Sequence, residues 1–307
     1  MRVAFLGTAE FAVKVLSVLA RSAAHRPVIA VTPPDRPRGR GRRITSPPVA
    51  AAAKELGIDL HQTESVNLEA SRAAIAAAGA EIGLVCAFGQ LIREPLLFEL
   101  ELWNAHPSLL PRWRGAAPIE RAILAGDRRT GVSIARVTAG LDSGPVALRS
   151  AVAIAPEDDY GSLSERLAGL GGKLAVDVLE RRAAGEIAAI EQDDAAATYA
   201  KKIEPGERRL DASRRAADLA RVVRALTPHI GAYLELAGGE RLGVRRAAVA
   251  DDAVPSGDLL PAREAILLGC SPGVLALRVV QPAGRREMTS AEYLRGHALP
   301  RLAAAPR

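Results

Sequence analysis

The first two hundred residues alternate short apolar runs with alanine-rich segments of helical periodicity. The apolar runs RVAFLG, PVIAVT, IGLVCAF and LWNAH have the length and composition of buried strands. Helical patterns follow Thr8 and cover about Val49 to Leu56 and Leu68 to Ala78. Strands separated by helices in this way predict a parallel sheet with helices on both faces, where functional sites gather at the carboxyl ends of the strands.

The first strand-to-helix turn, FLGTAEFA, argues against a bound dinucleotide. It contains a single glycine, whereas a dinucleotide-binding turn needs three spaced glycines. We expect Thr8 to cap the helix that follows. The prediction is therefore a Rossmann-like, mostly parallel sheet without the Rossmann cofactor.

The rest of the chain predicts a second, smaller domain. GVSIARV and GPVALRSAVAI predict two more strands, and a long helix is expected from Ser162 to about Ala184. After a loop-rich segment come a helix from about Ala212 to Leu226 and the short runs AYLELA, GVRRAAV, AILLG and VLALRVV, separated by Gly and Pro. This spacing predicts a small OB-like β-barrel. We assign residues 1–190 to the first domain, 191–207 to a linker and 208–307 to the barrel.

Charge and cysteine content set broad limits on the function. The net charge is +6, and from Pro205 onward 16 Lys and Arg face 11 Asp and Glu. A polyanionic partner and an ordinary soluble surface both fit this bias. Two cysteines, no paired histidines and no signal or membrane segment predict a cytoplasmic protein without a metal site, and we expect a monomer.

The stretch NAHPSLLPRWRG, from Asn104, combines polar side chains with a rigid backbone. In an extended segment Asn104 and His106 point to one side, so both can donate hydrogen bonds to one developing oxyanion. Asp142, in GLDSG, is a carboxylate that could lie beside His106, orient it and favour its charged form. The alternatives are structural: a polar pair that caps a strand and an aspartate that only starts a turn.

A second polar stretch, DRPRGRGRR, packs five arginines among Gly and Pro: Arg36, Arg38, Arg40, Arg42 and Arg43. Its glycines indicate a loop that is not ordered without a partner. Such a charge run fits either a solvated face or contact with nucleic acid. Composition alone leaves both possibilities open.

Seven stretches together carry a resemblance to a known family. They are GTAEFA, PDRPRGRGRR, NAHPSLLPRWRGAAPIERAILAGD, TGVSI, GLDSG, TYAKKI and QPAGRREM. In their order and spacing they resemble the methionyl-tRNA formyltransferases over nearly the whole chain. The combination of SLLPRWRGAAPI with Asn-x-His before it and Leu-Asp-Ser-Gly after it is specific to folate-dependent formyltransferases.

The resemblance implies an activity and a catalytic set. It implies transfer of a formyl group from the co-substrate 10-formyltetrahydrofolate to the α-amino group of methionine on initiator tRNA, within a catalytic domain over residues 1–190. Asn104 and His106 would hold the oxyanion, and Asp142 would orient or charge His106 and help to move the proton. The folate pocket would use Phe88, Gly89, Gln90, Leu91 and Ile92, with Ser108, Leu109, Leu110 and Pro111 walling the site.

For tRNA, the resemblance implies two contact regions. The arginine-rich loop would enter the acceptor stem, with Arg40 at its central basic position, and Arg112 and Arg114 would lie near the acceptor end or the folate tail. The C-terminal domain would add phosphate contacts. The chain departs from the family at Arg93, where Pro is usual, a minor change just past the folate-pocket residues. It also departs at Ala212, where Trp is common, and over Thr227 to Gly231, and these two departures bear on tRNA docking and not on the catalytic set.

Three rival functions remain at this stage. Two are other folate chemistries that use the same Asn, His and Asp set: N-formyl transfer to a nucleotide sugar, and hydrolysis of 10-formyltetrahydrofolate. The third is a non-catalytic RNA-binding protein that has kept the fold. The arginine-rich loop and the barrel-like tail favour tRNA, and the intact polar set argues against the third.

Overall fold

The computed structural model describes residues 1–38 and 41–303, which form two compact units. Unit 1 comprises Met1–Pro118, Arg129–Ala153 and Ser164–Ala200. Unit 2 comprises Ile119–Arg128, Ile154–Leu163 and the described residues from Lys201 onward. The segment 191–200, which we assigned to a linker, belongs to unit 1, and the domain limits at 190 and 207 stay predictions.

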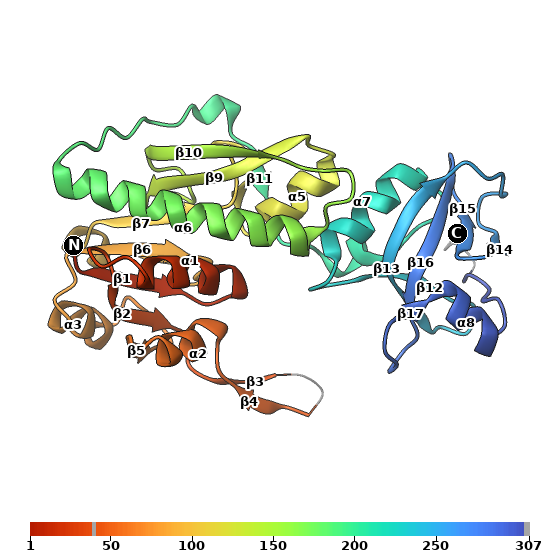
Figure 1. Cartoon of the computed structure of the whole chain (residues 1–307), viewed down its shortest axis with the longest axis horizontal. Coiled ribbons are helices and arrows are strands. Elements are labelled where there is room, and N and C mark those ends of the chain that lie inside the picture. Colours follow the sequence, from red (N-terminus) through yellow and green to blue (C-terminus); the bar gives the residue numbers. More distant parts are fainter. Residues whose placement is uncertain (39–40, 304–307) are drawn as a thin grey trace. The chain divides into compact units, whose positions relative to one another are not determined.

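Unit 1 is built on a seven-stranded sheet in the order β10-β9-β7-β6-β1-β2-β5 (Figure 1). Its central strands β1, β2, β5, β6 and β7 are parallel, and β9 and β10 add an antiparallel edge. The strand bounds are Val3–Gly7 (β1), Pro27–Thr32 (β2), Asp59–Gln62 (β5), Ile82–Cys86 (β6), Leu102–His106 (β7), Arg129–Arg136 (β9) and Val146–Ala153 (β10). The predicted mostly parallel sheet is confirmed.

Both faces of this sheet are covered because its strands are apolar on both sides. One face packs on α3 and α4 through alternate strand residues such as Ala4, Leu6, Ile29, Val31 and Val85. The intervening residues Val3 and Phe5 are also fully buried. The helices of unit 1 are α1 (Glu10–Ala20), α2 (Pro48–Glu55), α3 (Glu69–Ala77), α4 (Leu96–Glu99) and α6 (Tyr160–Ala184), of which α6 begins in unit 2. Helix α5 (Pro118–Ala125) belongs to unit 2 from Ile119 onward.

The prediction that Thr8 caps the first helix is wrong. The N-cap of α1 is Ala9, which makes no side-chain cap. The Thr8 hydroxyl instead donates to the carbonyl of Phe88, at 2.6 Å. Thr8 follows β1 and Phe88 follows the neighbouring strand β6, so the two meet at the carboxyl edge of the sheet, and this tertiary partner replaces the local one.

The arginine-rich stretch contains a small antiparallel hairpin. β3 (Arg36–Arg38) pairs with β4 (Arg43–Thr45), and the hairpin projects beyond α2 (Figure 1). Arg40 lies outside the described residues. Unit 1 also contains a two-stranded parallel pair, β8 (Arg114–Gly115) with β11 (Tyr199–Ala200), and a short 3-10 helix, Asp194–Ala196.

Unit 2 is the predicted β-rich domain. Its strands pair in the order β12-β13-β16-β15-β14, with β17 on β16. Residues of α7, among them Leu219 and Val223, pack on the sheet through partners such as Val244 and Leu277. The bounds are α7 (Ala216–Leu226), β12 (Ala232–Glu235), β13 (Arg241–Ala250), β14 (Leu259–Pro261), β15 (Ile266–Gly269), β16 (Val274–Gln281), β17 (Met288–Thr289), α8 (Ser290–Gly296) and a 3-10 helix (Pro205–Arg208).

The start of α7 is later than predicted. We expected this helix from about Ala212, but it begins at Ala216. The Asp211 carboxylate accepts a hydrogen bond from the backbone N–H of Ser213 at 3.0 Å, which stabilises a turn there instead. Within residues 1–38 and 41–303, no helix is both long and apolar enough to cross a bilayer.

A bidentate ion pair inside unit 2 makes the stability of that unit depend on pH. Arg121 holds Glu207 with nitrogen-to-oxygen distances of 2.5 and 3.0 Å, and its hydrogen bonds hold the pKa of the Glu207 carboxyl below the ordinary 4.5. A carboxyl group with a lowered pKa stabilises the folded state above its unfolded pKa and loses that effect as the pH falls through the folded pKa.

We therefore expect Glu207→Gln to lower the free energy of unfolding of unit 2 at pH 7 and to have little effect near pH 3. The loss at pH 7 should be about 1 kcal/mol, because the side chain is 37% exposed and solvent screens the pair. Hydrogen exchange of the β13 and β16 amides, measured at both pH values, checks this. An equal loss at both would show that the carboxylate charge is not the cause.

Candidate active site

Two polar side chains lie at the C-terminal end of strand β7, as the sequence predicts. Asn104 and His106 are on one side of the strand, and both approach Asp142. Their neighbours Trp103 and Ala105 point into the core and are 2% and 1% exposed. The strand ends at His106, so the pair stands at the carboxyl edge of the sheet, where parallel sheets place their sites.

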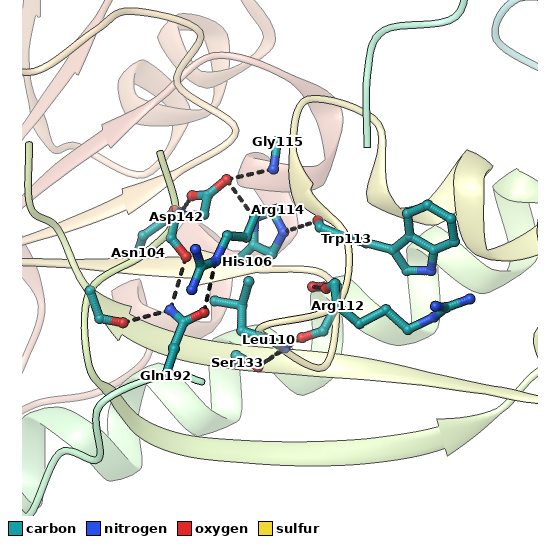
Figure 2. Close-up of polar contacts among 12 residues, drawn as sticks. Asn104, His106, Leu110, Arg112, Trp113, Arg114, Gly115, Ser133, Asp142 and Gln192 are labelled. Carbon is teal, nitrogen blue, oxygen red and sulfur yellow. Dashed lines mark hydrogen bonds and ion pairs between the residues drawn. The ribbon is translucent and has the colours of Figure 1, made fainter. Parts of the chain in front are cut away.

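Asp142 joins three groups of this edge (Figure 2). Its Oδ1 accepts a hydrogen bond from Nδ2 of Asn104 at 3.0 Å, and its Oδ2 accepts one from the backbone N–H of Gly115 at 2.8 Å. Nδ1 of His106 lies 3.6 Å from Oδ2. The predicted neighbours are therefore in place, and Gly115 is an additional contact.

The turn that carries Asp142 is held close to its own strand. It connects β9 and β10, and β9 pairs directly with β7, which brings the turn over Asn104. Gly144 is required here, because a Cβ on it would lie 2.0 Å from the carbonyl oxygen of Arg136. Asp142 itself has a φ of 47°, in the left-handed region.

The hydrogen bond on the far side of His106 identifies its tautomer. Nε2 lies 2.8 Å from the backbone carbonyl oxygen of Trp113. A carbonyl only accepts, so Nε2 must carry a hydrogen. Nδ1, which faces Asp142, is then the position at which the ring gains or loses a proton.

Buried serines fix the loop that follows β7. The Ser108 hydroxyl donates to the Arg112 carbonyl at 2.6 Å. The Ser133 hydroxyl donates to the Ser108 carbonyl at 2.8 Å and accepts from the backbone N–H of Leu110 at 3.1 Å. Both serines are fully buried. These contacts make the predicted rigid loop, and they place Leu110 and Pro111 of the predicted folate wall beside strand β9.

A segment distant in sequence closes the same loop. Thr198 accepts hydrogen bonds from the backbone N–H of Trp113, at its hydroxyl, and of Arg114, at its carbonyl, at 2.9 and 2.8 Å. Gly115 has a φ of 116°, and a Cβ there would lie 3.0 Å from the carbonyl oxygen of Ala200. The backbone N–H of Gly115 is thereby aimed at Asp142.

The predicted folate loop follows β6 and reaches the same sheet edge. Phe88 and Ile92 are buried, and the carboxamide of Gln90 is used inside the protein, where it accepts from Val66 N–H and donates to the Thr63 carbonyl. Leu91 remains 59% exposed. Phe88, Gln90 and Ile92 are thus anchored by their side chains, which leaves Leu91 and the loop backbone on the outside.

The arginines that we predicted to bind tRNA differ in their environment. Arg36, Arg42 and Arg43 are all exposed, and Arg36 is paired with Glu64. Arg112 lies over the ring of Trp113, 4.4 Å from its centre. Nothing is described of the Arg38 side chain.

Arg114 is an exception among these arginines. It is 3% exposed, and its guanidinium donates to Gln192 Oε1 at 3.0 Å and to Asp194 Oδ1 at 2.7 Å. A buried guanidinium with two internal partners cannot reach a phosphate without losing both, so its placement disfavours the predicted contact with tRNA.

Two residues of the site were not found from the sequence. Gln192 donates to the backbone carbonyls of Asp142 and Gly144, and Thr198 holds the loop backbone. Both lie in a polar segment without periodicity, and their partners are about 50 and 85 residues away. Periodicity therefore carries no signal for them, although Thr198 begins the stretch TYAKKI that contributes to the family resemblance. Over residues 1–38 and 41–303, no cluster of three His, Cys, Asp or Glu side chains is suited to a metal ion.

Comparison with known proteins covers both units. A family model described as formyl transferase matches residues 1–179, and one described as formyl transferase, C-terminal domain, matches residues 202–298. A methionyl-tRNA formyltransferase of Dinoroseobacter shibae is 43% identical over 302 residues, which is 98% of this chain and 99% of that protein. One of Methylococcus capsulatus is 41% identical over 303 residues, 97% of this chain and 98% of that protein.

Solved structures share the fold at low identity. An N-formyltransferase of Helicobacter canadensis, in complex with folinic acid and dTDP-3-aminofucose, aligns with a TM-score of 0.65 at 13% identity, over 90% of this chain and 99% of that chain. HypX of Aquifex aeolicus, in complex with tetrahydrofolic acid, aligns with a TM-score of 0.66 at 16% identity, over 96% of this chain and 47% of that chain.

Proposed function

This chain belongs to the formyl transferase family, and we propose that it transfers a formyl group from 10-formyltetrahydrofolate to the α-amino group of methionyl initiator tRNA. The observation that carries the proposal is the combination of full-length identity, 43% to a methionyl-tRNA formyltransferase, with an assembled Asn104, His106 and Asp142 set. The product is the formylated tRNA used in translation initiation. A cytoplasmic location and a monomeric state are parts of this proposal.

The reaction requires oxyanion stabilisation and proton transfer. The amine nitrogen forms a bond to the formyl carbon, the carbon–nitrogen bond to the folate breaks, and one proton moves from the amine to the leaving nitrogen. The carboxylate contact uses one of the two amide hydrogens of Asn104, so the second can be donated to the developing oxyanion. Nδ1 of His106, beside Asp142, is the position at which this chain can hold or move the proton.

The loop after β6 fits a flat folate ring. Gly89 has a φ of 75°, and no atom beyond its two chain neighbours lies within 4 Å of a Cβ built on it, so there is open space over its backbone. Leu91 offers an exposed apolar side chain beside it. We propose that Phe88, Gly89, Gln90, Leu91 and Ile92, with Ser108, Leu109, Leu110 and Pro111, hold the folate, and that its formyl group supplies the electrophilic carbon.

The basic hairpin supplies the tRNA contacts in unit 1. Arg42 and Arg43 are exposed on an element that projects from the unit, a position suited to phosphates. We include Arg36, Arg38, Arg40 and Arg112 in the proposed tRNA surface. Arg114 is omitted because it is buried.

The test is formyl transfer to methionyl initiator tRNA, measured with uncharged tRNA and a dTDP-amino sugar as controls. We expect transfer only to the charged tRNA. Transfer to the sugar would identify the N-formyltransferase alternative, which shares the fold with the Helicobacter canadensis enzyme. Loss of the formyl group from the folate to water alone would identify the hydrolase alternative.

The hairpin makes a separate prediction about salt. Replacing both Arg42 and Arg43 by alanine should raise KM for tRNA roughly 10-fold at moderate salt and make the plot of log KM against log salt shallower by about 1 to 2, as expected for two lost phosphate contacts. The exposed Arg181 of α6, changed to alanine, is the matched control. An unchanged slope in the double variant would remove the hairpin from the tRNA surface.

A further inference from the structure

Gln192 makes three hydrogen bonds that join separate parts of unit 1 (Figure 2). Its Nε2 donates to the backbone carbonyl oxygens of Asp142, at 2.9 Å, and Gly144, at 2.6 Å. Its Oε1 accepts from Nε of Arg114, at 3.0 Å. Both amide hydrogens are therefore used on the turn that carries Asp142.

The partners of Gln192 determine its orientation. Arg114 only donates and the two carbonyls only accept, so a flipped carboxamide would place like groups together on both sides. Arg114 is 3% exposed and is held at its other end by Asp194. A buried guanidinium with two partners is a firm support, because losing Asp194 leaves its charge unpaired and losing Gln192 leaves a buried N–H without an acceptor.

The turn needs such a support. The backbone of Asp142 is left-handed, which is costly for a residue with a Cβ. The same residue must aim Oδ1 at Asn104 and Oδ2 at Gly115 N–H and His106. Its carbonyl and that of Gly144 point at Gln192, so the carboxamide fixes the backbone from which the carboxylate extends.

We infer that Gln192, oriented by Arg114, is a positioning residue for Asp142, an inference that rests on the proposed function for its catalytic meaning. It touches neither the carboxylate nor the proposed reacting atoms. It acts by holding the backbone of the turn, so that the carboxylate meets Asn104, His106 and Gly115. Gln192 lies in the segment 191–200. This segment therefore contributes a positioning residue to the candidate active site.

The variants Gln192→Glu and Gln192→Leu distinguish the contact in which Gln192 accepts from Arg114 from the contacts in which it donates to the turn. The glutamate retains an acceptor for Arg114 and loses both donors to the turn, whereas leucine loses every hydrogen bond. We expect both to lower kcat by about 10- to 100-fold and to change KM for folate and tRNA by less than about twofold, since lost positioning affects the transition state more than ground-state binding. The matched control is Gln281→Glu in unit 2, whose carboxamide likewise accepts from Arg245 and donates to a backbone carbonyl. It should leave kcat unchanged.

Two further readouts distinguish positioning from a merely structural role. In the Asp142→Ala background, Gln192→Leu should cause no further loss of kcat, whereas additive losses would overturn the inference. At lower pH the carboxyl group of the Gln192→Glu variant gains a proton and recovers one donor, so the ratio of its kcat to that of wild type should rise, which Gln192→Leu cannot show. If the kcat ratio to wild type did not change with pH in either variant, that result would also count against the inference that Gln192 positions Asp142.

Hydrogen exchange decides the inference independently of activity. The backbone N–H of Gly115 donates to Asp142, so its exchange should be about 5- to 10-fold faster in Gln192→Leu, the effect of losing about one hydrogen bond. Unchanged exchange at Gly115 would overturn the inference even if wild type transfers formyl groups. Faster exchange in a protein that transfers none would support the positioning contact and refute the proposed function.

Discussion

Asp142→Ala is expected to lower kcat for formyl transfer by about 10²- to 10⁴-fold, the range for a group that supports positioned proton transfer. The carboxylate holds three partners: Asn104 at 3.0 Å, Gly115 N–H at 2.8 Å and Nδ1 of His106 at 3.6 Å. Alanine removes the carboxylate that faces Nδ1 of His106, the ring nitrogen not engaged by the Trp113 carbonyl. Steady-state kinetics with both substrates at saturation measure the effect.

The companion variants make this prediction specific. Asp142→Asn keeps the shape, but its NH₂ group must face one of two donors, so we expect a loss within about tenfold of that in Asp142→Ala. Asp59, an exposed aspartate of β5, is the control, and Asp59→Ala should leave kcat unchanged. If Asp142→Ala retained more than about a tenth of wild-type kcat, Asp142 would be an element of the turn and not of the reaction.

Asn104→Ala is expected to lower kcat by about 10²- to 10³-fold, the usual effect of removing one donor to an oxyanion. One amide hydrogen of Asn104 is directed to Asp142, and the other is available to the substrate. Since the oxyanion forms only during the reaction, KM for either substrate should change little.

Binding and kinetics together test this assignment. Folate affinity of Asn104→Ala, measured by equilibrium titration, should match that of wild type. A rise in KM with an unchanged kcat would place Asn104 in substrate binding instead. Asn104→Ser, with a shorter donor, should fall between wild type and alanine if the hydroxyl can still reach the oxyanion.

Local periodicity predicted most of the elements of unit 1. PVIAVT and LWNAH are strands β2 and β7 with the predicted bounds, and the helix expected up to Ala184 ends there. These elements have strong apolar patterns, and burial against the rest of the sheet reinforces what the pattern favours. The short strands β8 and β11 were missed, since two residues carry no periodicity and pair only through contacts far apart in sequence.

The same contrast separates the site residues. Asn104 and His106 were found because a strand places alternate residues on one side, and Asp142 because a carboxylate in a glycine-flanked turn is chemically distinctive. The resemblance placed Arg114 near the tRNA acceptor end or the folate tail, but it is buried against Gln192 and Asp194. Charge in a sequence does not distinguish a solvent-facing arginine from one that supports the backbone.

The sequence by itself determined the parallel-sheet class, the β-rich second unit, and the strand that presents Asn104 and His106, because these follow from short-range patterns of apolar and polar residues. Only the tertiary structure decided that Thr8 binds a carbonyl beyond β6, and that Gln192 holds the turn of Asp142. The physical reason is that a hydrogen bond between distant residues depends on where two backbones meet, which the sheet order and the turn geometry determine and no local pattern records.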